Sequence, residues 1–64
     1  MVRVNGTEMD IAGKTVSEYL AITRYDPKRI AVERNGDIVF KSRYDAVVLE
    51  DGDSLEIVSF VGGG

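Results

Sequence analysis

The stretch Ser54-Leu55-Glu56-Ile57-Val58-Ser59-Phe60-Val61-Gly62-Gly63-Gly64 decides how the rest of the chain is interpreted. Its first part alternates as a strand does, with Leu55 and Ile57 on the side expected to face a core. The glycines that follow have no side chains, so their chemical handles are backbone amides and, at Gly64, one α-carboxylate. Residues 61–64 span roughly 13 Å when extended, which is enough to carry that carboxylate into a narrow cleft of another protein.

Val58 and Phe60 fall on the other face of the same strand. Either they form an exposed apolar patch beside the tail, where a partner would dock, or a bulge or second layer buries them. For the glycines, the alternative to a functional tail is a linker or a disordered chain end. The candidate site residues are Val58, Phe60 and Val61 for partner binding, Gly62 and Gly63 for threading, and Gly64 for the reaction.

The composition allows one small domain and little chemistry of its own. The chain has 64 residues, and we expect a domain over residues 1–60 followed by a flexible tail over 61–64. Without Cys or His it lacks the usual nucleophiles, the neutral-pH proton shuttles and the commonest transition-metal ligands. We therefore expect no catalytic residue, no metal site, no cofactor and no enzyme activity.

The charge pattern bears on partners and on location. A formal net charge of −3 argues against nucleic acid, although Lys28, Arg29, Arg34, Lys41 and Arg43 could form a basic patch. The acidic residues of 50–56 are interpreted as solvated, with steering toward a basic partner as the alternative. No apolar run approaches the ~20 residues of a membrane span and no signal pattern opens the chain, so we expect a cytoplasmic protein without membrane contact.

Residues 1–11 predict a hairpin, because alternating residues flank Asn5-Gly6, a strong two-residue turn. Pairing across this turn sets Val4 opposite Thr7, Arg3 opposite Glu8 and Val2 opposite Met9. The apolar side chains, which are Val2, Val4, Met9 and Ile11, then share one face, with an opposite-charge pair on the other.

A helix follows the hairpin. Thr15 and Glu18 fit a capping box at its start. The residues on its apolar arc are Val16, Tyr19 and Leu20, with Ile22 at the edge. We expect Asp26-Pro27 to end the helix, because a residue before proline is pushed out of the α region.

Residues 30–40 predict a second hairpin around Asn35-Gly36, with Arg34 opposite Asp37 and Val32 opposite Val39. This register leaves Ala31 and Phe40 on the opposite face, so either a bulge re-aims part of the hairpin or a partner covers that face. A polar connection over 41–45, with room for one helical turn, and a short extended segment over 46–49 lead through a turn at 50–53 to the final strand, 54–61.

This order of elements is that of the ubiquitin-like β-grasp, an α+β fold with a mixed sheet and one helix packed across it. Three stretches, at residues 30–39, 49–58 and 61–64, resemble the thiamine-biosynthesis sulfur carriers, the ThiS family; they read IAVERNGDIV, LEDGDSLEIV and VGGG. The opening Val4-Asn5-Gly6 and the helix start Thr15-Val16 fit as well. The chain departs from the family at Phe40, often proline there, and in a helix that is less rich in leucine.

The resemblance implies a function for the tail. An E1-like adenylating enzyme of the ThiF type would convert the Gly64 carboxylate to an acyl-adenylate. A sulfur donor protein would then supply the sulfur of a thiocarboxylate, which thiazole synthase would consume. The alternatives are a sulfur carrier for molybdopterin synthase, a ubiquitin-like protein modifier, and a passive interaction module whose glycines have no role.

Overall fold

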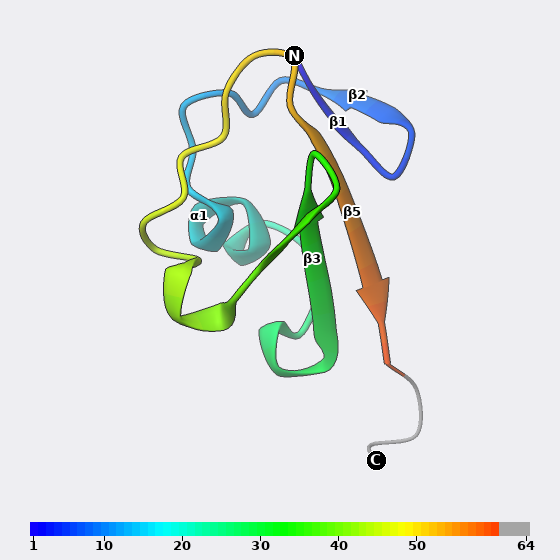
Figure 1. The fold of residues 1–64 in the computed structure, drawn as a ribbon, viewed down its shortest axis with the longest axis vertical. Coiled ribbons are helices and arrows are strands. Elements are labelled where there is room, and N and C mark those ends of the chain that lie inside the picture. The colour runs from blue at the N-terminus through cyan, green and yellow to red at the C-terminus, as the bar shows by residue number, and fades with distance from the viewer. Residues whose placement is uncertain (61–64) are drawn as a thin grey trace.

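Residues 1–60, the part of the chain that the computed structural model describes, form one five-stranded mixed sheet with a helix packed across one face (Figure 1). The strand order is β2-β1-β5-β3-β4. In chain order the elements are β1 (Val2–Val4), β2 (Thr7–Met9), α1 (Val16–Ala21), the 3-10 turn η1 (Pro27–Arg29), β3 (Ile30–Arg34), β4 (Asp37–Val39), the 3-10 turn η2 (Lys41–Arg43) and β5 (Ser54–Ser59). The last strand is therefore central, parallel to β1 and antiparallel to β3.

The first hairpin has the predicted register. Val2 pairs with Met9, Arg3 with Glu8 and Val4 with Thr7. The two valines are buried and Met9 packs against the core. On the other face, Arg3 Nε lies 3.3 Å from Glu8 Oε2, an exposed pair that contributes less than about 1 kcal/mol.

The helix begins as predicted. The Thr15 side chain accepts a hydrogen bond from the Glu18 amide at 3.0 Å, and the Glu18 carboxylate accepts one from the Thr15 amide at 2.8 Å. The buried residues of the helix are Val16, Tyr19 and Leu20. Both predictions, the capping box and the apolar arc, are confirmed.

The predicted helix end is wrong. The helix stops at Ala21, because the amides of Ile22 and Thr23 bond to carbonyls only three residues back. The Thr23 hydroxyl also donates to the Leu20 carbonyl at 2.8 Å, which satisfies a terminal acceptor. Ile22 consequently projects into solvent instead of joining the edge of the buried arc.

The second hairpin also has the predicted register, with Val32 opposite Val39 and Arg34 opposite Asp37. The pairing runs without a bulge, which leaves the outward side chains uncovered by any described residue. Ile38 and Phe40 are 61% and 70% exposed. The explanation by a bulge is therefore wrong for this hairpin.

The connection from β4 to β5 crosses the helix side of the sheet. The polar connection contains one helical turn, η2, as expected. The predicted extended segment over 46–49 makes only a single bridge, from Val48 to Thr15, and its neighbour Leu49 is buried in the core. The predicted end of the last strand at Val61 lies outside the described residues.

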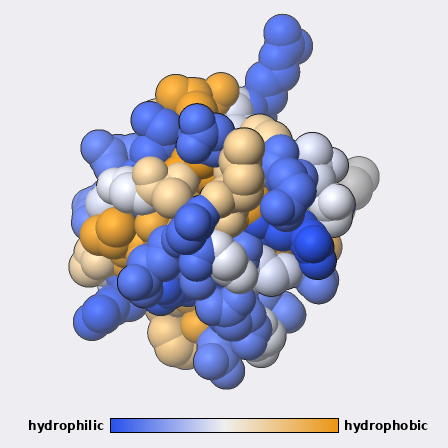
Figure 2. All heavy atoms as spheres, turned by 90° about the horizontal axis from the view of Figure 1, so that it is seen from above, coloured by the Kyte–Doolittle hydropathy of each residue, from blue (hydrophilic) through white to orange (hydrophobic). Residues whose placement is uncertain are grey.

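The core lies between the helix and the inner face of the sheet. It consists of Val2, Val4, Ile11, Val16, Tyr19, Leu20, Ile30, Val32, Tyr44, Leu49, Leu55 and Ile57. Viewed from the end that carries the N-terminus, the outer surface is mostly hydrophilic with small apolar areas (Figure 2). Within residues 1–60 no helix is long and apolar enough to cross a membrane.

Candidate functional site

The candidate site is the point where β5 leads out of the sheet toward the glycines. On the β3 side the strand is held to its last described residue, because Ala31 pairs with Val58, Ile30 pairs with Ser59, and the Phe60 amide donates to the Arg29 carbonyl at 2.7 Å. The turn η1 therefore fixes one edge of the strand at the exit.

The other edge of β5 is held by one asparagine side chain. The Asn5 amide donates to the Leu55 carbonyl at 2.9 Å. Beyond it, Asn5 Oδ1 accepts from the Ile57 amide at 2.8 Å and Nδ2 donates to the Ile57 carbonyl at 3.2 Å. The side chain thus replaces a strand residue at the point where the backbone of β1 turns away, at a positive φ of 49°.

An apolar strip lies on the outer face of the sheet beside the exit. Val58 and Phe60 are 56% and 55% exposed, so the alternative in which they are buried is wrong. Val58 is opposite Ala31, and the β3–β4 register continued by one residue brings Phe40 to the other side of Ala31. We call Phe40, Ala31, Val58 and Phe60 the exit patch.

The remaining candidate residues, Val61, Gly62, Gly63 and Gly64, lie outside the described residues. Their roles in binding, threading and reaction stay predictions. What the structure adds is the position of the residue from which they start, since Phe60 is tied to η1.

The acidic turn before β5 is not simply solvated. Asp53 is 7% exposed and accepts hydrogen bonds from Arg34 Nε at 2.8 Å, Asn35 Nδ2 at 3.0 Å and the Glu50 amide at 2.8 Å. Burial raises the pKa of Asp53, but these hydrogen bonds and the Arg34 charge together outweigh burial and hold the pKa below its usual value. The interpretation as a solvated loop is therefore wrong for this residue.

This ion pair also changes the predicted basic patch. Arg34 bonds Asp53 and the exposed carboxylate of Glu50, at the end of the sheet that carries the Asn35-Gly36 turn. Gly52 donates there to the Met1 carbonyl at 2.8 Å, so the acidic turn lies near the N-terminus, away from the exit (Figure 1). Within residues 1–60, the charge of Arg34 is thus paired with two carboxylates, unlike the side chains of Lys28 and Arg43.

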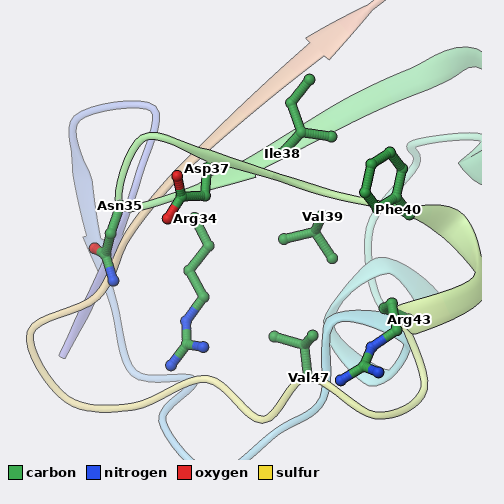
Figure 3. Close-up of a pocket in the computed structure, with 8 residues that line it drawn as sticks. All are labelled: Arg34, Asn35, Asp37, Ile38, Val39, Phe40, Arg43 and Val47. Carbon is green, nitrogen blue, oxygen red and sulfur yellow. The ribbon is translucent and has the colours of Figure 1, made fainter.

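A shallow hollow of about 270 Å³ lies beside β4. Val39 and Val47 line it between Arg34 on one side and Arg43 and Phe40 on the other (Figure 3). Asp37 is its only carboxylate, and residues 1–60 contain no group of three side chains suited to hold a metal ion. The hollow offers contact surface and no set of reacting groups.

A mixed sheet with a central last strand held on both edges, and a helix packed across one face, define a ubiquitin-like β-grasp protein. The structure superposes on the thiamine biosynthesis protein ThiS of Geobacter metallireducens with a TM-score of 0.78 and 34% identity, over 98% of this chain and 97% of that one. The sequence model of the ThiS family matches residues 2–64. The chain belongs to the ThiS family.

The sequence relatives are of two lengths. The sulfur carrier protein ThiS of Bacillus subtilis is 43% identical over an alignment of 68 positions, which covers 100% of each chain. A protein named thiazole synthase from Paramagnetospirillum magneticum is 48% identical over 62 residues, which are 95% of this chain and 19% of that protein. A second thiazole synthase, from Magnetococcus marinus, is 43% identical over 53 residues, 16% of its length. The chain thus spans less than a fifth of these two relatives.

Proposed function

We propose that this chain is a sulfur carrier of thiamine biosynthesis that carries the sulfur as a thiocarboxylate on Gly64. The observation that supports this most directly is the family match to residue 64, which includes the terminal glycines. The similarity over the full length of a protein named sulfur carrier ThiS favours this branch over a molybdopterin-synthase subunit. In this proposal residues 1–60 are the folded carrier and 61–64 the reacting tail.

The chemistry requires activation of a carboxylate. An oxygen of the Gly64 carboxylate attacks the α-phosphorus of ATP, which forms the acyl-adenylate and releases pyrophosphate. The terminal sulfur of a persulfide on the donor protein then displaces AMP at the carbonyl carbon and forms an acyl disulfide. A thiol attacks the donor's sulfur in this S–S bond, which releases the thiocarboxylate and leaves a disulfide between the thiol and the donor. The chain contributes no Cys or His side chain to these steps, so catalysis belongs to the partners and the chain is a substrate.

The braced strand supports delivery of the tail. Because β5 is held by Arg29 on one edge and Asn5 on the other, the tail starts from a fixed point. Four extended residues reach roughly 13 Å from it. Glycines at 62 and 63 present no side chain to the walls of a cleft, which is the role we propose for them.

The exit patch is the proposed docking surface for the partners. Exposed aromatic and aliphatic side chains beside a reacting tail can be buried by a partner, and aromatic residues often dominate such contacts. Val61 extends this surface in the proposal. Docking the patch would align the tail with the cleft.

The proposed partners are an E1-like adenylating enzyme, a sulfur donor protein and thiazole synthase, all in the cytoplasm, where ATP is supplied. The last of these is supported by the two relatives named thiazole synthase, in which a segment similar to this chain is part of a longer protein. A protein modifier would use the same activated carboxylate, and conjugates of higher mass in cell extracts would distinguish it.

The test is the intact mass of the chain after incubation with ATP, an adenylating enzyme active on a known ThiS and a sulfur source. We expect the mass to rise by the exchange of one oxygen for sulfur. A matched chain that lacks Gly64 should show no change. An unchanged mass of the full chain, with the enzyme active on its own carrier, would refute the proposal.

A further inference from the structure

The cations of this chain are gathered at the end from which the tail leaves. Residues 24–29 and 41–43 contain five of the eight Lys and Arg residues of the chain and one of its eleven Asp and Glu residues, although the whole chain has a net charge of −3. The rest of the surface is accordingly acidic. Neither the described hydrogen bonds that hold β5 nor the chemistry proposed for the carboxylate uses the charge of these side chains.

Two hydrogen bonds join these segments to the exit. The Arg29 carbonyl accepts from the Phe60 amide at 2.7 Å, so η1 lies against the last described residue of β5. Lys41 Nζ donates to the Lys28 carbonyl at 3.3 Å, which links η2 to η1. Arg43, at the end of η2, lines the same hollow as Phe40 of the exit patch (Figure 3). We call Lys28, Arg29, Lys41 and Arg43 the exit cations.

The exit cations are largely free to meet a partner. All four are exposed. Among residues 1–60, the side chains of Lys28 and Arg43 make no hydrogen bond or ion pair, and Arg29 makes only an exposed contact of 3.6 Å with Asp26. Asp26 is in turn occupied, since its carboxylate accepts from the Lys28 amide at 2.9 Å. At an ionic strength of about 0.1 M, an exposed cation can act on a partner's charges over about 10 Å, the Debye length, beyond which its field is largely screened.

We propose that the exit cations bind an acidic rim around the tail cleft of the adenylating enzyme, and that this contact orients the carrier with its tail forward. The inference rests on the proposed function. A carrier with a net negative charge is repelled by an acidic surface in every orientation except the one that presents its cationic end. The charge pattern therefore selects, before contact, the encounter in which Gly64 can enter the cleft.

Orientation matters most at the adenylation step. The carrier must bring an anionic carboxylate to a site that also holds ATP, so two negative groups have to approach each other. Attraction at the base of the tail offsets that repulsion without placing a cation in the cleft, because the exit cations lie near Phe60, four residues before Gly64. Such contacts act mainly on the association rate and depend on salt.

The experiment compares single charge reversals that change the net charge equally. Lys28→Glu and Arg43→Glu alter exit cations, and Lys14→Glu, at an exposed residue before α1, is the matched control. Association with the adenylating enzyme that converts the wild-type chain is measured by stopped flow at low salt and at 0.5 M salt. The mass assay is run on each variant at saturating concentration, and circular dichroism checks the fold.

At low salt we expect each exit variant to associate roughly threefold more slowly than the wild type and a double variant roughly tenfold, with the difference vanishing at high salt. The control should change by less than about twofold. All variants should still gain sulfur at saturation. Equal rates for exit variants and control, or a loss that persists at high salt, would overturn this inference alone. A wild-type chain that gains no sulfur would overturn the proposed function and this inference with it.

Discussion

Replacement of Asp53 by Asn should destabilise the fold strongly, because the carboxylate lies at the centre of a buried polar cluster. It accepts from Arg34, from Asn35 and from the Glu50 amide at 2.8–3.0 Å. Asparagine keeps the shape but loses the charge and one acceptor oxygen. At least one donor is then left without an acceptor, and the Arg34 charge keeps only its exposed partner.

The size of the effect follows from these contacts. Hydrogen bonds to a charged group contribute about 1.5–3 kcal/mol each, and an unsatisfied buried donor costs about 1–3 kcal/mol. The Arg34 side chain is 27% exposed, so water recovers part of the loss. We expect a decrease of about 2–4 kcal/mol in the free energy of unfolding, against a total of about 3–10 kcal/mol for a domain of this length. The melting temperature should fall by at least about 10 °C.

The assay is thermal and urea unfolding followed by circular dichroism, with Glu50→Gln as the matched control. Glu50 bonds the same arginine, but its side chain is 74% exposed, so its replacement should cost less than about 1 kcal/mol. If Asp53→Asn melted within about 2 °C of the wild type, or no lower than the control, the cluster would not stabilise the fold as described.

Comparison of the wild type with Asp53→Asn at different pH values also tests the direction of the pKa shift of Asp53. Because its folded pKa lies below the unfolded value, ionised Asp53 contributes stability above about pH 4, and that contribution is lost as the pH falls through the folded pKa. The difference in stability between wild type and Asp53→Asn should therefore be constant near neutral pH and narrow below about pH 4. A difference that widened in acid would contradict the assigned direction of the shift.

Three further variants test the exit. The double variant Val58→Ser/Phe60→Ser should lose less than about 2 kcal/mol of stability, since both side chains are about half exposed, and its KM for adenylation should rise at least about tenfold. The control is Ile22→Ser, which is exposed elsewhere on the surface. An unfolded double variant would mean that the exit patch is part of the core. Gly63→Val should melt like the wild type in circular dichroism yet gain no sulfur in the mass assay; normal turnover would remove the need for threading. Asn5→Ala should lose about 1–2 kcal/mol in urea unfolding, because β5 loses its side-chain bonds, and an unchanged midpoint would show that they are dispensable.

Local patterns carried much of the fold prediction. The registers of both hairpins follow from Asn5-Gly6 and Asn35-Gly36, because a two-residue turn leaves only one pairing of the flanking residues. The helix start follows from two residues three apart, Thr15 and Glu18. In each case the partners are close in sequence, so no knowledge of the tertiary structure is needed.

The features that the sequence does not predict involve hydrogen-bond partners that are distant in the chain, or residues that resemble their neighbours in the sequence pattern. The bonds of Asp53 to Arg34 and Asn35 span 18 or 19 positions, and in the sequence Asp53 looks no different from its solvated neighbours. The Asn5 side chain bonds a residue 52 positions away, while its sequence context explains only the turn. Thr23 carries no stop signal as strong as that of the proline four residues later, so the sequence predicts a helix end that lies beyond the observed one.

The sequence predicts which face of β5 carries Val58 and Phe60, but not whether that face is exposed. Alternation places Val58 and Phe60 opposite the core residues of β5, yet a second layer could have covered that face. Only the three-dimensional arrangement, with α1 and the long connection both on the inner side, leaves it open. The role of the glycines is likewise predicted by the sequence pattern, and the mass assay must test it.

The placement of β5 between β1 and β3 has a mechanical consequence. Under the proposed function, a partner that draws the tail into its cleft would pull along the axis of a central strand, so the bonds of both edges would share the load. An edge strand would carry the same force on the hydrogen bonds of one side alone. The Asn5 bonds and the Arg29–Phe60 bond are the nearest to the pulled end on their respective sides and take the load first. A carrier built in this way would keep its fold closed while a partner holds the tail and takes the sulfur, as repeated rounds of the proposed transfer require.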